Sequence, residues 1–205
     1  MNIRAAAATD DEGRNFGNGE KMIRTLVGFL SVFQLFVWQG TVAWSTDGKS
    51  TDGKLGVASA QLKNSKGEVV GSAMFQETGQ GVRISLNASG LPPGKHGIHF
   101  HEKGSCVGPD FKSAGEHLNP LGKEHGLKSS KGAHAGDLPN LVVPANGAVR
   151  AEFFSDRITL KDGANNLLKA GGTALVIHAQ ADDQKTSPTG GSGARILCGE
   201  VKALS

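Results

Sequence analysis

The sequence of 205 residues contains no tyrosine, and its two tryptophans, Trp38 and Trp44, both lie near the amino terminus. It also has no run of five like charges, and its formal net charge is only +3. Proteins that bind nucleic acid usually carry a clustered basic surface, and those that bind single strands stack the bases on aromatic side chains. Both features are missing, so nucleic acid is not expected among the partners.

Helical periodicity is missing as well, because apolar residues nowhere repeat at helical spacing over three turns. The chain instead has 30 glycines and short segments of alternating or β-branched apolar residues between turn signals. This pattern predicts an all-β fold of eight strands, a sandwich or barrel. The predicted strands are residues 57–63, 69–76, 82–88, 97–102, 141–143, 148–154, 173–179 and 196–202.

Two predicted connections, residues 103–140 and 180–194, are much longer than the usual loop between strands. Loops of this length without regular structure are usually either functional or disordered. We therefore expect the functional residues to lie in or beside them.

An uncharged and mostly apolar run covers residues 25–44, with Arg24 before it and a polar stretch from residue 45 to 54 after it. This is the outline of an export signal, and we predict that residues 22–45 are a cleaved signal peptide. An uncleaved membrane anchor through residues 25–44 and a buried helix of the fold are the alternatives. Export predicts an extracytoplasmic location: secreted, periplasmic or attached to the cell envelope.

One region is predicted before this apolar segment and two after it. Residues 1–21 are predicted to be a poorly ordered tail, or a mis-assigned start if translation begins at Met22. Residues 46–54 are predicted to be a linker, and residues 55–205 form the predicted domain.

All seven histidines lie in the predicted domain, at positions 96, 99, 101, 117, 125, 134 and 178. His99 and His101 are two apart in a predicted strand, so their side chains lie on one face and are spaced to bind one metal ion. His178 ends another predicted strand and offers a third imidazole, a favoured ligand of copper, zinc and iron.

The first long loop contains a second set of metal-ligating residues. His117, His125, His134 and Asp137 supply three imidazoles and one carboxylate, which make a closed tetrahedral zinc site. Any one of these histidines alone could be a hydrogen-bonded or exposed residue without a metal. The clustering of the whole set, together with the strand doublet, favours metal binding.

The chain has two cysteines, Cys106 and Cys198. Export would place them in an oxidising compartment, which predicts a single disulfide. Two buried free thiols are the alternative.

Four motifs between residues 94 and 199 resemble copper/zinc superoxide dismutase. They read GKHGIHFHE, SAGEHLNP, HAGDLPN and GARILCG, at residues 94–102, 113–120, 134–140 and 193–199. The resemblance covers residues 55–203 and is highly specific. The early loop cysteine, in the stretch from residue 103 to 106, is similar to the exported bacterial branch of the family.

The resemblance implies an eight-stranded Greek-key barrel with a role for each matched residue. Asp182 would hydrogen-bond a copper ligand and a zinc ligand, Arg195 would attract superoxide, and Cys106 would pair with Cys198. Copper would be bound by His99, His101, His117 and His178, and zinc by His117, His125, His134 and Asp137.

The implied activity is a superoxide dismutase, which converts superoxide to dioxygen and hydrogen peroxide by cycling copper between Cu(II) and Cu(I). His117 would bridge the metals and carry a proton to the second superoxide. A homodimer is left open. The alternative function is a non-catalytic copper/zinc-binding or copper-delivery protein on the same fold.

Two features depart from the family pattern. Glu116 stands where a glycine or proline usually precedes the bridging histidine. The loop from residue 180 to 194 lacks the acidic pair and lysine of the eukaryotic steering loop. No implied metal ligand is missing, which favours the enzyme over the non-catalytic alternative.

Overall fold

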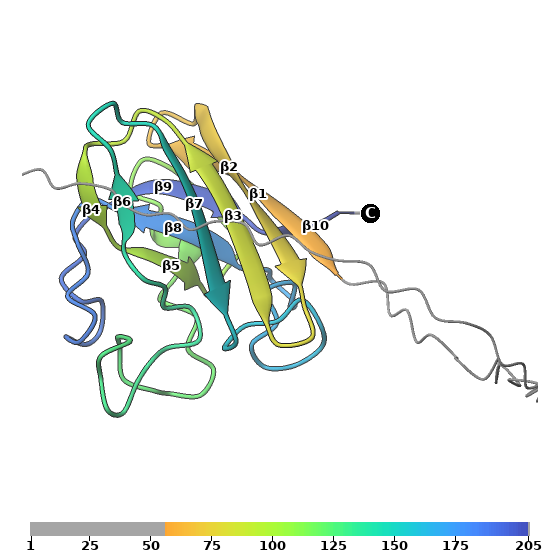
Figure 1. The fold of residues 1–205 in the computed structure, drawn as a ribbon. Helices are drawn as coiled ribbons and strands as arrows, with labels where there is room; N and C mark the ends of the chain where they lie inside the picture. The colour runs from red at the N-terminus through yellow and green to blue at the C-terminus, as the bar shows by residue number, and fades with distance from the viewer. Residues whose placement is uncertain (1–55, 205) are drawn as a thin grey trace, which may run out of the picture. The chain divides into compact units, whose positions relative to one another are not determined.

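The computed structural model describes residues 56–204, drawn in colour in Figure 1. Within this range, no helix has the length and apolar character needed to cross a bilayer. The predictions for residues 1–21, 22–45 and 46–54, including the export signal, lie outside the described residues.

The described residues form ten strands and one short 3-10 helix, η1 at Lys112–Ala114. The strands are β1 (Val57–Asn64), β2 (Val69–Glu77), β3 (Val82–Ala88), β4 (Gly94–His96), β5 (Ile98–His101), β6 (Leu141–Val143), β7 (Val149–Ser155), β8 (Ala174–His178), β9 (Arg195–Glu200) and β10 (Lys202–Ala203).

Eight of these strands form one curled antiparallel sheet in the order β5-β8-β9-β1-β2-β3-β7, with β10 paired to the start of β1. Figure 1 shows β1, β2, β3 and β7 in one layer, with β5, β8 and β9 behind them. The chain leaves β3, forms the separate β4-β6 pair, and returns to β3 as β7. The all-β Greek-key prediction is confirmed, and β4 and β10 are short additions to the eight predicted strands.

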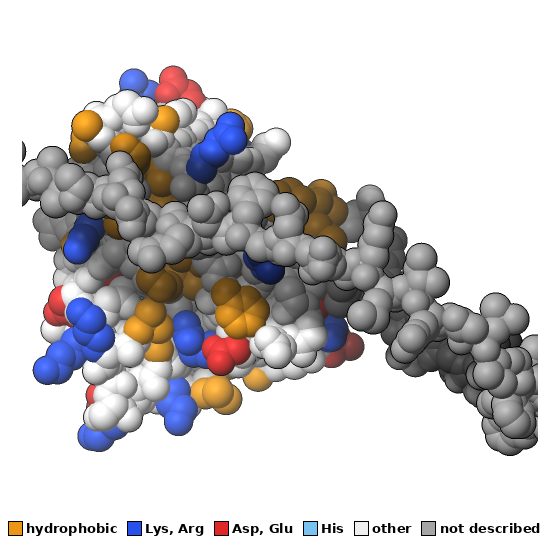
Figure 2. All heavy atoms as spheres, in the orientation of Figure 1, with side chains coloured by type: hydrophobic (Ala, Val, Ile, Leu, Met, Phe, Trp, Pro, Cys, Tyr) orange, Lys and Arg blue, Asp and Glu red, His pale blue; other side chains and the backbone are white. Residues whose placement is uncertain are grey.

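Alternating burial explains why the front layer folds as strands. In β3 the buried side chains are Val82, Ile84, Leu86 and Ala88, and the intervening residues face outward. This period of two places one face of the strand on the core. The outer face carries interspersed charges of both signs, as Figure 2 shows, including the exposed ion pair of Arg83 with Glu152 at 4.0 Å.

The core lies between the two layers of the sheet. Phe75 of β2 and Phe100 of β5 pack edge to face there, with their ring centroids 5.5 Å apart. Aliphatic side chains from both layers, such as Ile84 and Ile177, are fully buried around them. Burial of this continuous apolar surface is the main stabilising contribution to the fold.

Strands β5 and β8 differ from the front layer because every residue in both is buried. Their inward residues, such as Ile98 and Ile177, belong to the core. Their outward residues include His99, His101 and His178, which alternation places on the other face. The long connections between β5 and β6 and between β8 and β9 supply the partners that bury this face.

A disulfide joins Cys106 in the first of these loops to Cys198 in β9, with a Cα–Cα distance of 5.6 Å. The predicted disulfide is therefore confirmed. Cys198 also packs in a small apolar cluster with Phe111 and Ala114 from the loop and Val176 from β8. The disulfide and this cluster together fix the loop against the outer face of the rear layer.

Candidate metal centre

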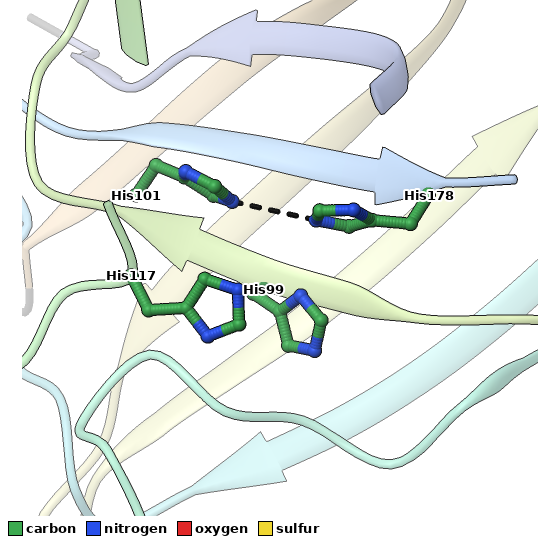
Figure 3. A group of neighbouring side chains, drawn as sticks. All are labelled: His99, His101, His117 and His178. Carbon is green, nitrogen blue, oxygen red and sulfur yellow. Dashed lines mark hydrogen bonds between the residues drawn. The ribbon is translucent and has the colours of Figure 1, made fainter. Parts of the chain in front are cut away.

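Four histidines meet on the outer face of β5 and β8, as Figure 3 shows. His99 and His101 come from β5, His178 from the end of β8, and His117 from the first long loop. Strand pairing brings β5 beside β8, and an isolated bridge between His101 and His117 brings the loop beside them. We call these residues the four-histidine group.

Each strand histidine in this group is oriented by a hydrogen bond at one ring nitrogen. His99 Nε2 lies 2.7 Å from Asp182 Oδ2, and His101 Nδ1 lies 2.9 Å from the Gly115 carbonyl. His178 Nδ1 lies 3.2 Å from the Gly193 carbonyl. These acceptors require a proton on the bonded nitrogen, so the other nitrogen of each neutral ring keeps a free lone pair.

A second group adjoins the first and consists of His117, His125, His134 and Asp137, all buried. Asp137 Oδ1 lies 3.2 Å from His117 Nδ1, 3.1 Å from His125 Nδ1 and 3.4 Å from His134 Nδ1. The other oxygen, Oδ2, accepts hydrogen bonds from the backbone N–H groups of Gly126 and His134. We call these residues the loop group.

His117 belongs to both groups, and its two ring nitrogens have different surroundings. Nδ1 lies within 3.3 Å of both Asp137 Oδ1 and His134 Nδ1 in the loop group. Nε2 is buried and has no hydrogen-bond partner among the described residues. One imidazole can therefore serve one metal ion on each side.

Unpartnered nitrogens show that the groups are suited to metal ions. His99 Nδ1, His117 Nε2 and His125 Nδ1 are buried without a hydrogen bond among residues 56–204. In the four-histidine group, His101 Nε2 and His178 Nε2 face each other at 3.4 Å, the dashed line in Figure 3. Buried polar atoms without partners are costly, and one metal ion in each group would coordinate these nitrogens.

Burial keeps three members of the four-histidine group in the neutral form that binds a metal ion. It lowers the pKa of His117 to about 4 and that of His178 to about 3. Burial likewise holds the pKa of His101 well below its ordinary value. These rings are neutral at neutral pH, and the neutral imidazole is the form that binds a metal ion.

In the loop group, charged neighbours shift the pKa values in the direction opposite to the effect of burial. Burial alone would lower the pKa of His125, but the carboxylates of Asp137 and Asp182 outweigh it and raise the pKa to about 9. Burial would raise the pKa of Asp137, but its three imidazole neighbours hold that pKa well below the usual range. The concentrated negative charge suits a divalent cation, whose binding would displace the proton from His125.

Asp182 connects the two groups. Its carboxylate lies 2.7 Å from His99 Nε2 and 3.0 Å from His125 Nε2, and the group is fully buried. The Gln184 backbone N–H donates to Asp182 Oδ1 at 2.6 Å. Gly190 packs so closely against this carboxylate that a Cβ atom there would overlap it. The predicted contact of Asp182 with one residue of each group is present in the structure.

Asn140 holds the backbone of Asp182 through two hydrogen bonds. Its Nδ2 donates to the Asp182 carbonyl at 2.7 Å, and its Oδ1 accepts from the Asp182 N–H at 2.9 Å. The amide thus connects the first long loop to the second. Asn140 was not among the predicted site residues, although it lies in one of the motifs that resemble the family.

Arg157 was also missed. Its Nη2 donates to the Asp137 carbonyl at 2.9 Å from the loop after β7. Nothing in its local sequence distinguishes it from an exposed arginine, because the contact depends on a loop 20 residues away in sequence. The remaining histidine, His96, lies outside both groups, with its ring nitrogens 2.8 Å from the carbonyls of His178 and Pro92.

A cleft of about 570 Å³ lies beside the four-histidine group: it is lined by Glu116, which precedes His117, and by Gly193, whose carbonyl contacts His178. Arg195 lines it, with Nη1 and Nη2 bound to the Phe111 and Gly115 carbonyls at 2.8 and 2.7 Å. Gly193, whose carbonyl orients His178, also lines the cleft, and the Gly115 carbonyl, which orients His101, accepts a hydrogen bond from Arg195. The cleft is the candidate path for a small anion.

Comparisons with known proteins identify the fold and the family. A family model described as copper/zinc superoxide dismutase matches residues 69–201. The chain belongs to the copper/zinc superoxide dismutase family. Cu-Zn superoxide dismutase 2 of Aquifex aeolicus is 50% identical over 147 residues, 71% of this chain and 86% of the relative.

Further relatives agree with this assignment. A Cu-Zn superoxide dismutase of Caulobacter vibrioides is 45% identical over 148 residues, 71% of this chain and 85% of the relative. The crystal structure of a double mutant of a SOD-like protein from Bacillus subtilis superposes with a TM-score of 0.68 at 49% identity, covering 69% of this chain and 95% of that one. Membership in the copper/zinc superoxide dismutase family supports copper and zinc as cofactors, superoxide as substrate and a dismutase activity.

The Asn140 contact generates a prediction. An aspartate at position 140 cannot donate to the Asp182 carbonyl, so Asn140→Asp should loosen Asp182 and, through it, His99 and His125. We expect zinc affinity to fall by roughly 10- to 100-fold, the usual cost of losing an outer hydrogen bond at a metal site. Competition with a chelator measures the affinity.

The matched control for this experiment is Asn146→Asp. Asn146 is exposed in the turn before β7, and its Oδ1 only accepts a hydrogen bond, from the Ala148 N–H. A carboxylate keeps that bond, so zinc affinity should stay unchanged. Equal zinc affinity in the Asn140 and Asn146 variants would show that Asn140 does not position the metal centre.

Proposed function

We propose that this chain removes superoxide by converting two superoxide anions and two protons to one dioxygen and one hydrogen peroxide. The observation that carries the proposal is the pair of buried groups that share His117 within a member of this family. Two groups with one common imidazole couple a redox site to a structural one.

In this proposal, the four-histidine group holds copper and the loop group holds zinc. When bound, copper supplies a one-electron couple that first accepts and then returns an electron, while zinc is redox-inactive. Three imidazoles with one carboxylate are a usual zinc set, and four imidazoles suit copper. The ligands are His99, His101, His117 and His178 for copper, and His117, His125, His134 and Asp137 for zinc.

Three residues of the chain have separate roles: one attracts the substrate, one transfers a proton, and one orients the histidine ligands. The Arg195 guanidinium attracts the superoxide anion at the cleft, where neutral carbonyls hold its charge in place. When His117 Nε2 is not bound to copper, it would take up a proton and deliver it to the second superoxide, a role supported by its burial and lack of a partner among the described residues. Asp182 keeps His99 and His125 in the tautomers that direct their free nitrogens to the metals.

We also propose that residues 22–45 export the protein, that residues 46–54 are a linker, and that residues 55–205 form the enzyme domain. The uncharged run at residues 25–44 supports export, and the disulfide of Cys106 with Cys198 agrees with an oxidising, extracytoplasmic location. Cleavage is favoured over anchoring because Gln34 and Gln39 interrupt the apolar run.

The alternative is a non-catalytic copper/zinc-binding or copper-delivery protein, since one solved relative is described only as SOD-like. Both metal groups are complete in this chain, which favours the enzyme. Purified protein with measured copper and zinc contents separates the two, because only the enzyme removes superoxide.

Arg195 provides a direct test of catalysis. Arg195 belongs to neither metal group, so Arg195→Glu should change the copper and zinc contents far less than it changes the rate. The rate of superoxide removal should fall roughly 10-fold or more at low ionic strength and then rise with added salt, because salt screens the new repulsion over about 10 Å at 0.1 M. A rate equal to wild type in low salt would remove Arg195 from the mechanism.

His117 belongs to both metal groups and Asp137 to only one, so variants of these two residues should differ in metal content. His117→Ala should lower the content of both metals and abolish activity, whereas Asp137→Ala should mainly reduce zinc affinity, by at least roughly 10-fold. Metal analysis and activity on the same sample measure both effects, with Asp162→Ala in an exposed loop as the control. Full copper content and unchanged activity in the His117 variant would disprove the shared role.

Export can be tested by spectroscopy, because no tryptophan or tyrosine follows Trp44. A form cleaved after Ser45 should show no indole fluorescence and very little absorbance at 280 nm, whereas an anchored form keeps both indoles. The measurement is the emission spectrum of protein isolated from its native host. Tryptophan emission in a membrane fraction would disprove cleavage, and reduced Cys106 and Cys198 in soluble cytoplasmic protein would disprove export.

A further inference from the structure

Glu116 is an exposed carboxylate at the entrance to the four-histidine group. It lines the 570 Å³ cleft together with Arg195, and it directly precedes His117. The preceding residue, Gly115, accepts hydrogen bonds from both His101 and Arg195. A charge at position 116 is therefore built into the rim through which a small anion passes.

The formal charges of the residues that line this cleft sum to zero. Lys112 and Asp110 form an ion pair at 3.0 Å and neutralise each other. Arg195 is bonded only to neutral carbonyls, and no ion pair within residues 56–204 involves either Arg195 or Glu116. The lining thus holds two cations, Lys112 and Arg195, and two anions, Asp110 and Glu116, for a formal net charge of zero.

We infer that Glu116 limits the capture of superoxide, so that this chain works below the rate its metal centre allows. The inference rests on the proposed function. A cleft with net positive charge raises the local concentration of an anion, and the carboxylate of Glu116 offsets the attraction of Arg195. Removing this one negative charge leaves the cleft with a net charge of +1.

The position of Glu116 allows its charge to be changed without disturbing the loop. Its backbone is held by the Glu102 N–H, which donates to the Glu116 carbonyl at 2.9 Å. Its carboxylate makes no hydrogen bond with another described residue. Glu116→Gln keeps the size of the side chain and removes only the charge, so a change in rate would report electrostatics.

The experiment compares wild type, Glu116→Gln and Glu152→Gln, each loaded with copper and zinc. Glu152 is an exposed carboxylate on β7 outside the cleft, so its variant has the same net charge as the Glu116 variant. The rate constant for superoxide removal is measured from low to high ionic strength. Azide, a monovalent anion that binds Cu(II), is titrated separately to give a dissociation constant that does not depend on turnover.

We expect Glu116→Gln to be roughly two- to fivefold faster than wild type at low ionic strength. The gain should shrink as salt is added, because the Debye length falls from about 10 Å at 0.1 M to about 3 Å at 1 M. Azide should bind more tightly by a similar factor. Glu152→Gln should match wild type in both measurements.

The outcomes separate this inference from the proposed function. Active wild type with equal rates and azide affinities in the two variants would overturn the role of Glu116 while leaving the dismutase intact. A gain that persists at high salt would also overturn it, because a change in structure rather than in charge would be responsible. Wild type that binds both metals without removing superoxide would refute the proposed function, and the azide comparison would still decide the role of Glu116.

Discussion

The hydrogen bonds of Asp182 are the interaction on which the rest of the metal centre depends. One buried carboxylate accepts from His99 Nε2 and His125 Nε2, and so fixes which nitrogen of each ring stays free. Out of contact with water, such bonds are strong when complete and costly when broken. The chain therefore surrounds Asp182 with backbone contacts from Asn140 and Gln184, and it keeps a glycine at position 190 where any side chain would displace the carboxylate.

The barrel contributes to this centre by presenting histidines on the strand face that points away from its core. Residues of β5 alternate between Ile98 and Phe100 in the core and His99 and His101 outside it. A two-residue spacing on a strand gives a fixed separation without any loop geometry. The loops then supply the remaining ligands and exclude water, which explains why β5 and β8 are buried on both faces although they lie at the end of the sheet.

Sequence patterns predicted the strands and the clustering of histidines well, because both depend on local spacing and side-chain chemistry. The two-residue period located β3 and β7, and the His99 and His101 doublet indicated a common face. The contacts of Asn140 and Arg157 could not be predicted in this way, since each joins loops that are close only in the folded chain. The short strands β4 and β10 were missed because pairing with β6 and β1, rather than a residue pattern, defines them.

The disulfide and the substrate path are connected through two backbone carbonyls. Cys106 and Cys198 fix the loop to β9, and the apolar contacts of Phe111 hold its next turn. That turn presents the Phe111 and Gly115 carbonyls to Arg195, and the Gly115 carbonyl also accepts from His101. The charge at the cleft and the orientation of a metal ligand therefore share one acceptor. A displacement of this loop would alter anion attraction and metal geometry together, which is a physical reason for the chain to fix the loop covalently.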